Sequence, residues 1–316
     1  MLKRARSLLP AVASLSHSIR LRAFAKLNLG LKVLFPRPDG YHEIRTVYQT
    51  VALHDRLELT LIRQPGIVLD CQHASVPAGP GNLVYRACEL WREERKFNGG
   101  ILARLEKGIP SGAGLGGGSS DAAAALMGLE RLTGNQLSDA TLFRLAASLG
   151  SDVPLFLLGG RVLGCGRGEE VYPLADLAPR KCLVVHPGFP VSTPEAYRQL
   201  SLRLTRSKED RKVEFFGVWP QLSLQEWGPA ENDFESVVFA KWPELGDLKN
   251  QFIRAGAETA SLTGSGSAVY AVFDSARKLI RASKGVSREW AVFQTRTLRR
   301  REYRRLLFAL PRGRNA

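Results

Sequence analysis

In the segment Leu21–Phe35, every second residue is apolar. A period of two over fifteen residues indicates one long β-strand, because successive side chains of a strand point to opposite faces. The uniformly apolar face must cover a core. The opposite face carries Lys26 and Asn28, two residues apart, so both polar groups are predicted to project from the same side of the strand.

The rest of the chain mixes strand and helix patterns without strict alternation of the two. Strands are predicted over residues 44–53, 56–63, 101–105, 161–165, 182–186, 260–263, 268–273 and 290–295. Helices are predicted over residues 83–97, 122–132, 142–149, 194–200, 234–240, 245–255 and 276–283. This order favours an α+β fold.

A length of 316 residues suits two domains. The pattern changes near Gly160, which predicts an N-terminal domain over residues 21–160 and a C-terminal domain over residues 161–295. Residues 1–20 are predicted to form a basic, disordered extension. Residues 296–316 form an Arg-rich tail with a solvated helix face, whose leucines can anchor a short helix on the body.

The formal net charge of +15 is concentrated at the two ends of the chain. Residues 1–22 carry five Lys or Arg and no acid, and residues 277–316 carry thirteen Lys or Arg and two acids. The body between them holds 27 basic and 28 acidic residues. Nucleic-acid binding would therefore rest on the tails alone, and it is not the favoured interpretation.

The composition also bears on the compartment. Four widely spaced cysteines with no CxxC pair exclude a zinc ribbon and favour a reducing compartment, the cytoplasm. The basic, serine-containing N-terminus leaves import into an organelle open. No run of about 18 apolar residues occurs, so neither a membrane-spanning helix nor a membrane partner is expected.

The segment Ile109–Asp121 contains five glycines within seven residues, directly before a strongly helical segment. Ordering glycines costs conformational entropy, so such a run needs a reason. Bare backbone amides can surround an anion, and the following helix adds about half a positive charge at the same place. The sequence predicts a nucleotide phosphate loop, with Ser119 and Ser120 as helix caps or as ligands of a phosphate or magnesium ion.

Three other interpretations of this segment are weaker. A flexible linker is not expected directly before a helix. Gly112, Gly114 and Gly117 fit the GxGxxG spacing of nicotinamide-dependent dehydrogenases, but the region that should supply the next strand and its acid is predicted to be helical. A Walker A loop would end in Gly-Lys-Ser or Gly-Lys-Thr, and this one does not.

Asp152 stands at the start of an apolar segment, Val153–Leu158, where an unpaired carboxylate would be costly. On spacing alone, a helix-terminal or turn aspartate is the simpler interpretation. Lys26, on the inner strand, needs an opposite charge. A paired Lys and Asp beside a phosphate loop would serve phosphoryl transfer to a hydroxyl, with the carboxylate accepting or orienting the hydroxyl proton.

Other polar groups give weaker signals. Tyr41 and His42 follow an Asp-Gly turn, where both side chains could be exposed together. Alternatively, Tyr41 packs in the core and His42 is an ordinary surface residue. The segment Pro187–Tyr197 could face a substrate. Asn82 is predicted to cap the following helix. The remaining histidines show no metal-ligand spacing, so the sequence assigns no metal ligands.

Three motifs together resemble those of the GHMP small-molecule kinases. Ala25–Leu29, Ile109–Asp121 and Leu262–Ser267 stand in the order of the first, central and third motifs of that family. With Arg37–Glu43 and Asp152–Pro154 added, the chain is similar to the branch that acts on a cytidine-diphosphate-linked methylerythritol in the non-mevalonate (MEP) isoprenoid route.

The resemblance covers roughly residues 20–295 and implies a two-domain fold with the active site in the cleft between the domains. It implies phosphate transfer from ATP, with Mg²⁺, to the 2-hydroxyl of that substrate. Asp152 matches the catalytic base and Lys26 its partner. The implied nucleotide-side residues are Asn82, Lys107, Pro110, Ser111, Gly112, Ala113, Gly114, Leu115, Gly116, Gly117, Gly118, Ser119 and Ser120. The implied substrate contacts are Asn28, Tyr41, His42, Thr193 and Tyr197.

Some alternatives stay open on the residues alone. A homoserine or mevalonate kinase of the same family is one, and a nicotinamide-dependent dehydrogenase is a more distant one. The basic head and the Arg-rich tail depart from the family pattern. A monomer and a homodimer are both compatible with the sequence.

Overall fold

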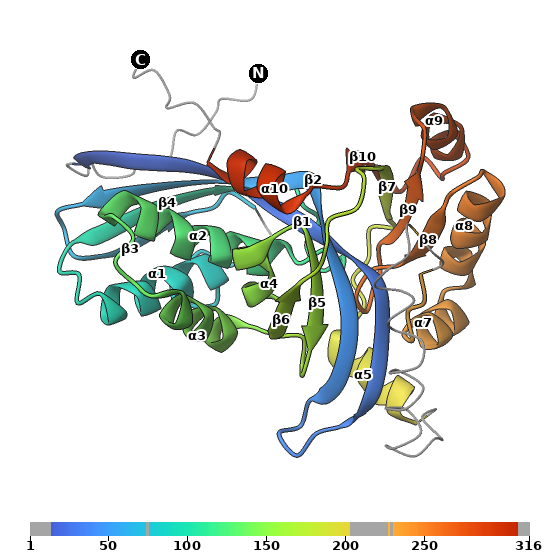
Figure 1. Ribbon diagram of the computed structural model, residues 1–316, viewed down its shortest axis with the longest axis horizontal. Coiled ribbons are helices and arrows are strands. Elements are labelled where there is room, and N and C mark those ends of the chain that lie inside the picture. Colours follow the sequence, from blue (N-terminus) through green and yellow to red (C-terminus); the bar gives the residue numbers. More distant parts are fainter. Residues whose placement is uncertain (1–13, 74–75, 203–226, 228–229, 309–316) are drawn as a thin grey trace, which may run out of the picture.

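The computed structural model of the chain describes residues 14–73, 76–202, 227 and 230–308. In this part of the chain the strands form two β-sheets, each with its own helices (Figure 1). Mixed helices and strands with mainly antiparallel pairing confirm the predicted α+β class.

The first sheet has six strands in the order β3-β4-β2-β5-β6, with β1 paired to β2. These strands are β1 (Ser14–Pro36), β2 (His42–Ile62), β3 (Gly66–Asp70), β4 (Gly100–Glu106), β5 (Arg161–Cys165) and β6 (Glu170–Pro173). One face of the sheet is covered by four helices, as Figure 1 shows: α1 (Leu83–Glu94), α2 (Gly117–Thr133), α3 (Asp139–Leu149) and α4 (Val153–Leu158).

The second sheet has four strands in the order β10-β7-β9-β8. They are β7 (Lys181–His186), β8 (Thr259–Leu262), β9 (Val269–Phe273) and β10 (Ala291–Arg296). The helices beside it are α5 (Thr193–Ser201), α7 (Glu235–Lys241), α8 (Pro243–Arg254) and α9 (Ala276–Lys284). A last helix, α10 (Arg300–Leu307), returns to the first sheet and packs on β1.

The first two strands are longer than the sequence predicts. Strand β1 begins at Ser14, within the predicted disordered extension, because Ile19 pairs with Leu59 of β2 and packs against the core. The earlier part of that extension lies outside the described residues. Strand β2 is a single 21-residue strand where two were predicted. Together they form a hairpin that projects past the first sheet toward α5 (Figure 1).

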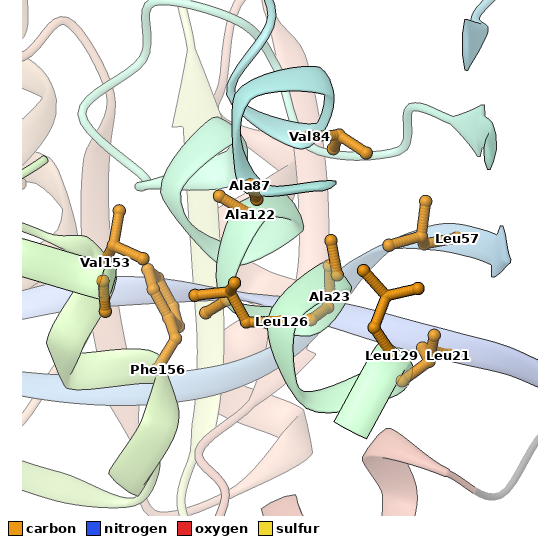
Figure 2. Packing of buried hydrophobic residues seen from close by; sticks show 14 of the residues in the cluster. Leu21, Ala23, Leu57, Val84, Ala87, Ala122, Leu126, Leu129, Val153 and Phe156 are labelled. Carbon is orange, nitrogen blue, oxygen red and sulfur yellow. The ribbon is translucent and has the colours of Figure 1, made fainter. Parts of the chain in front are cut away.

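The core of the first domain lies between α2 and this hairpin. Figure 2 shows Leu126 and Leu129 of α2 beside Leu21 and Ala23 of β1, and all four side chains are buried. Burying a leucine contributes about 1.5–3 kcal/mol. Helix α2 can approach closely because Gly128 has no side chain, since a Cβ there would lie 2.8 Å from Leu21.

Three hydrophobic clusters follow one another along β1. Leu21 belongs to the core of the first domain, Leu27 to a cluster at the junction, and Leu31 and Val33 to the core of the second domain. The strand therefore passes through both domains. Its middle, which carries the polar side chains of the first motif, lies where the domains meet.

The boundary between the domains falls later than predicted. Residues 161–165 form β5, which pairs with β2, and β6 pairs with β5. A division at Gly160 would therefore cut the first sheet, and the chain leaves that sheet only after Pro173. Strands β3 and β6 and helix α4 were not predicted; Pro154 at the start of α4 was the available signal.

The first part of the Arg-rich tail belongs to the folded body. Tyr303 and Leu307 of α10 are buried, as is Leu298 before it. The hydroxyl of Tyr303 donates a 2.6 Å hydrogen bond to the carbonyl oxygen of Phe156 in α4. The predicted apolar anchor of this tail is confirmed for Leu298 and Leu307, and residues 309–316 lie outside the described part.

Candidate active site

Lys26 and Asn28 lie on the middle of β1 between two irregularities of the strand. The register of β1 against β2 shifts between Phe24 and Lys26 and again between Asn28 and Gly30. Bulges re-aim side chains and are common beside active sites. Both polar residues are buried, with 3% and 1% of their surface exposed, and the positions next to them in the strand are apolar.

Asp152 meets Lys26 as predicted. Its Oδ2 lies 3.4 Å from Lys26 Nζ, and the hydroxyl of Tyr48 donates a 3.0 Å hydrogen bond to its Oδ1. Asp152 is the N-cap residue of α4, but its side chain makes no capping hydrogen bond. The helix-terminal interpretation is therefore wrong for the side chain, which faces the cation of β1 instead.

The environment of this pair is asymmetric. The side chain of Lys26 is 4% exposed, whereas that of Asp152 is 31% exposed. Burial, together with the charge of Asp152, raises the pKa of Tyr48 well above its ordinary value, so its hydroxyl stays protonated and can only donate to the carboxylate. Tyr48 was not predicted; the strand register places it opposite Asn28 on β2.

The glycine-rich loop runs directly past this pair. Gly112, Gly114 and Gly116 have φ values of 69°, 77° and 70°, and such left-handed residues alternating with others are typical of an anion-binding nest. Gly116 is the N-cap of α2, so Ser119 and Ser120 lie in the first turn and are not caps. A Cβ on Gly116 would lie 3.0 Å from Lys26 Cγ, which explains why only glycine fits there.

A cavity of about 390 Å³ opens over this loop. Every predicted nucleotide-side residue except Ser120 lines it, including Asn82, which caps α1 by accepting a 2.8 Å hydrogen bond from Val84 N. Ser120 is buried, and its Oγ has no hydrogen-bond partner within the described residues. Residues of the cavity wall that the sequence did not single out are Val76, Pro77, Gly81, Leu83 and Asp121.

Lys107 holds the floor of this cavity together. Its ammonium donates to Asp55 Oδ2 and, at 2.7 Å, to Asp121 Oδ2. Asp55 also accepts from the backbone of Gly108 and Ile109 at 2.6 and 2.8 Å. Burial lowers the pKa of Lys107, but the charges of the two carboxylates outweigh it and raise that pKa. Burial, together with the charge of Asp55, raises the pKa of Asp121 well above its usual range.

Asn28 joins β1 to the loop of the third motif. Its Oδ1 accepts hydrogen bonds from Lys26 Nζ at 2.6 Å and from Gly264 N at 2.8 Å, and its Nδ2 donates to Thr46 Oγ1 at 2.8 Å. Thr263 adds a bond from its hydroxyl to Asn28 Oδ1 at 3.2 Å. The side-chain oxygen and nitrogen of Asn28 are thus both hydrogen-bonded to protein groups, and the bond to Nζ fixes the position of Lys26.

A group of aromatic side chains lies beside the hairpin. The ring of His42 stacks on that of Tyr197 with centroids 4.9 Å apart, and Tyr197 meets Phe234 edge-on. Ser201 donates to the carbonyl oxygen of Tyr197 and lies 2.7 Å from His42 Nε2, so that nitrogen is the donor to Ser201. Burial lowers the pKa of His42, and burial with the charge of Asp152 raises the pKa of Tyr197.

Tyr41 and Thr193 lie apart from this stack. Tyr41 is 53% exposed near the tip of the hairpin, where the guanidinium of Arg167 lies 4.8 Å from its ring centroid, so core packing is excluded for it. The hydroxyl of Thr193, the first residue of α5, lies 2.8 Å from that of Ser265 in the third-motif loop. The sequence had no signal for Arg167 or Ser201.

Two other classes of site can be judged on the described residues. No group of three or more His, Cys, Asp or Glu side chains among them could hold a metal ion. Helix α2 is followed by α3 and α4 rather than by a strand, so the GxGxxG spacing does not open a dinucleotide-binding unit. In the same part of the chain, no helix is long and apolar enough to cross a bilayer.

Known proteins share this arrangement. Residues 82–160 match the GHMP kinases N terminal domain, and residues 221–292 match the GHMP kinases C terminal domain. The chain is 42% identical over 299 residues to the 4-diphosphocytidyl-2-C-methyl-D-erythritol kinase of Solibacter usitatus (strain Ellin6076), covering 93% of each chain. It is 42% identical over 260 residues to the enzyme of that name from Pelotomaculum thermopropionicum, covering 81% of this chain and 91% of the relative.

Solved structures agree. A 4-(cytidine 5'-diphospho)-2C-methyl-D-erythritol kinase superposes with a TM-score of 0.70 at 34% identity, over 88% of this chain and 99% of that one. A homoserine kinase from Cytophaga hutchinsonii shares the fold with a TM-score of 0.69 at 21% identity, over 91% and 97% of the two chains. With its motifs, its site geometry and its relatives in agreement, the chain belongs to the GHMP kinases and, within them, to the 4-diphosphocytidyl-2-C-methyl-D-erythritol kinase family.

Proposed function

We propose that this protein transfers the γ-phosphoryl group of ATP to the 2-hydroxyl of 4-diphosphocytidyl-2-C-methyl-D-erythritol, a step of the non-mevalonate isoprenoid route. The observation that carries the proposal is the position of Asp152. Its half-exposed carboxylate is paired with the buried Lys26 and stands next to a glycine loop shaped for phosphates. Phosphoryl transfer to an alcohol needs this combination.

In this proposal Asp152 receives the proton of the attacking hydroxyl. Tyr48 and Lys26 each hold one of its carboxylate oxygens, so the group is oriented before substrate binds. General-base assistance of this kind contributes about 10²–10⁴-fold to a rate. The ammonium of Lys26, held by Asn28, also places a positive charge where negative charge develops on the transferred group.

The triphosphate of ATP would lie over Gly112–Ser119, with α2 directing its N-terminus at it. A magnesium ion fits this chemistry, because such ions keep several waters and bind through phosphate oxygens with few protein ligands. The unpartnered Oγ of Ser120 suits that role, and Asp121 Oδ1 is likewise buried without a partner in the described residues. The ion would neutralise charge on the phosphates when bound.

The stacked rings of His42 and Tyr197 are proposed to form the cytidine side of the site, with Tyr41 and Thr193 at its edges. Aromatic faces suit a flat base, and burial holds the pKa of His42 below 6.5, which favours a neutral ring beside it. The four cysteines are free thiols, which fits the cytoplasm as the proposed location.

The test is ADP release, measured with one alcohol at a time. We expect turnover with 4-diphosphocytidyl-2-C-methyl-D-erythritol and at least 100-fold lower kcat/KM with homoserine or mevalonate, which lack the nucleotide that the aromatic group would bind. A titration with NADH serves as the dehydrogenase control and should show no binding. Preferred turnover of homoserine or mevalonate would overturn the proposed substrate.

A further inference from the structure

A second, larger cavity lies outside the site described above. It measures about 660 Å³, within the range of 300–1,000 Å³ usual for small-molecule sites. Its walls come from both domains: β2 and the end of β4 on one side, and β7, β10 and α9 on the other. None of the proposed catalytic or substrate residues lines it.

The charged lining of this cavity is mostly basic. Arg56, Lys107, Lys181 and Arg296 line it, against a single carboxylate, that of Glu106. Glu106 faces Arg56 at 3.5 Å with both side chains more than 60% exposed, and such a surface pair contributes little. Lys107 is already paired with Asp55 and Asp121, so the preference for an anion rests on Lys181 and Arg296.

Lys181 and Arg296 supply the positive charge that would attract an anion to this cavity. They stand directly opposite each other in the β7–β10 pair, where like charges are destabilising. Arg296 is held by Glu302, whose side chain does not line the cavity. Lys181 has no carboxylate partner among the described residues. An anion bound between them would offset the repulsion.

The rest of the wall is apolar or neutral. Leu279 and Ile280 of α9 line it, and Ile280 is 48% exposed although it is a large aliphatic side chain. The hydroxyl of Thr295 is buried in the same wall without a hydrogen-bond partner in the described part of the chain. A ligand with an anionic group and an apolar body would satisfy both kinds of surface.

Lys107 connects this cavity to the phosphate loop, because it lines both. Its Nζ lies 3.2 Å from where a Cβ of Gly117 would stand, at the start of α2. We propose that this second cavity, here called the rear cavity, binds a small organic anion with an apolar body, and that its occupancy changes nucleotide affinity through Lys107. By linkage, nucleotide then changes the affinity of the rear cavity equally.

The test uses 8-anilinonaphthalene-1-sulfonate, which combines one sulfonate with an apolar body, and N-phenyl-1-naphthylamine, the same body without the charge. Both are titrated by fluorescence into the full-length protein and into Lys181→Met. The matched control is Lys284→Met, which removes an exposed lysine of α9 outside the rear cavity. Losing one charge-assisted contact should weaken sulfonate binding about tenfold in Lys181→Met alone.

The neutral probe should bind both variants equally. Adding an imido analogue of ATP with magnesium should shift the sulfonate's Kd at least fivefold without removing the saturating signal. Lys181→Met should also melt at a higher temperature than wild type, since the cross-strand repulsion is gone. Equal sulfonate binding by the two variants, simple displacement of the dye by nucleotide, or a Kd that ignores nucleotide would each overturn the proposal.

Discussion

The hydroxyl of Tyr48 and the carboxylate of Asp152 are joined by a 3.0 Å hydrogen bond that only the tyrosine can donate. The two residues lie 104 positions apart, on β2 and at the start of α4. This bond and the Lys26 contact fix both oxygens of a carboxylate that still faces outward. Because this carboxylate is already held from two sides, it loses little orientational freedom when the substrate binds.

Tyr48→Phe should therefore lower kcat by about fivefold, because one buried hydrogen bond is worth about 1 kcal/mol and the phenylalanine keeps the packing. The KM for ATP should stay unchanged. Steady-state kinetics measure both constants. A kcat equal to wild type would show that Lys26 alone positions the carboxylate.

Asp152→Asn should lower kcat by about 10²–10⁴-fold while ATP binding survives, since the amide cannot take the proton and the residue lies outside the wall of the nucleotide cavity. Isothermal titration with an ATP analogue supplies the binding control. Turnover within a few-fold of wild type would remove Asp152 from the mechanism.

Lys107→Met should destabilise the fold by about 3–5 kcal/mol at pH 7, because it leaves Asp55 and Asp121 buried without their cation. Burial already raises the pKa of Asp121, so as pH falls the folded variant binds this proton before the unfolded chain does. Stability of the variant should thus recover relative to wild type as pH falls. Urea unfolding at pH 7 and pH 5 measures this, with Lys284→Met as the control that should change little.

His42 should give the opposite pH dependence. Burial places its pKa below the ordinary 6.5, so the unfolded chain binds the proton first as pH falls. Its contribution to stability is complete above 6.5 and is lost on acidification toward the folded pKa. His42→Gln should flatten the fall of Tm between pH 7 and 5 relative to wild type. Equal slopes in His42→Gln and wild type would refute this assignment.

Gly114→Ala should abolish ATP binding and destabilise the protein. Its Cβ would lie 2.1 Å from the carbonyl oxygen of Thr263, at a φ of 77° that disfavours side chains. Gly134→Ala is the matched control, because Gly134 has a φ of 92° and open space around it. The control should lose about 1–2 kcal/mol from strain alone and keep its ATP affinity. Similar ATP affinity in both variants would mean that the loop does not need its contact with Thr263.

Much of the fold could be predicted from local patterns. The alternation in β1 and the cap Asn82 were readable because they depend on near neighbours. The continuity of β2 was not, because Asp55 interrupts the apolar pattern and is accommodated by Lys107, Gly108 and Ile109, which lie 52 to 54 residues away. The early start of α2 was also missed, since glycine propensity opposes a helix that tertiary packing enforces.

The residues of the candidate site likewise fall into those that the sequence predicted and those that it did not. Lys26 and Asp152 could be paired from the sequence because each was a charge in an apolar setting. Tyr48 and Thr263 were not identified, since neither an ordinary Tyr in a strand nor a Thr just after one carries a sign of a distant partner. Asn28 was identified, but its hydrogen bonds to the loop of the third motif, 235 residues away, could not be predicted.

Helix α10 makes the first domain discontinuous in sequence. The domain begins with β1, near the start of the chain, and ends with α10, after the whole of the second domain. Gly159 shows how tightly α10 packs on the first domain, because a Cβ there would lie 2.1 Å from the ring of Tyr303. The chain reaches α10 only after every strand and helix of the second domain has been synthesised. The first domain therefore cannot complete its core until the second domain has been made. A fragment ending near Pro173 would expose the surface of Phe24 and Phe156 that Tyr303 covers.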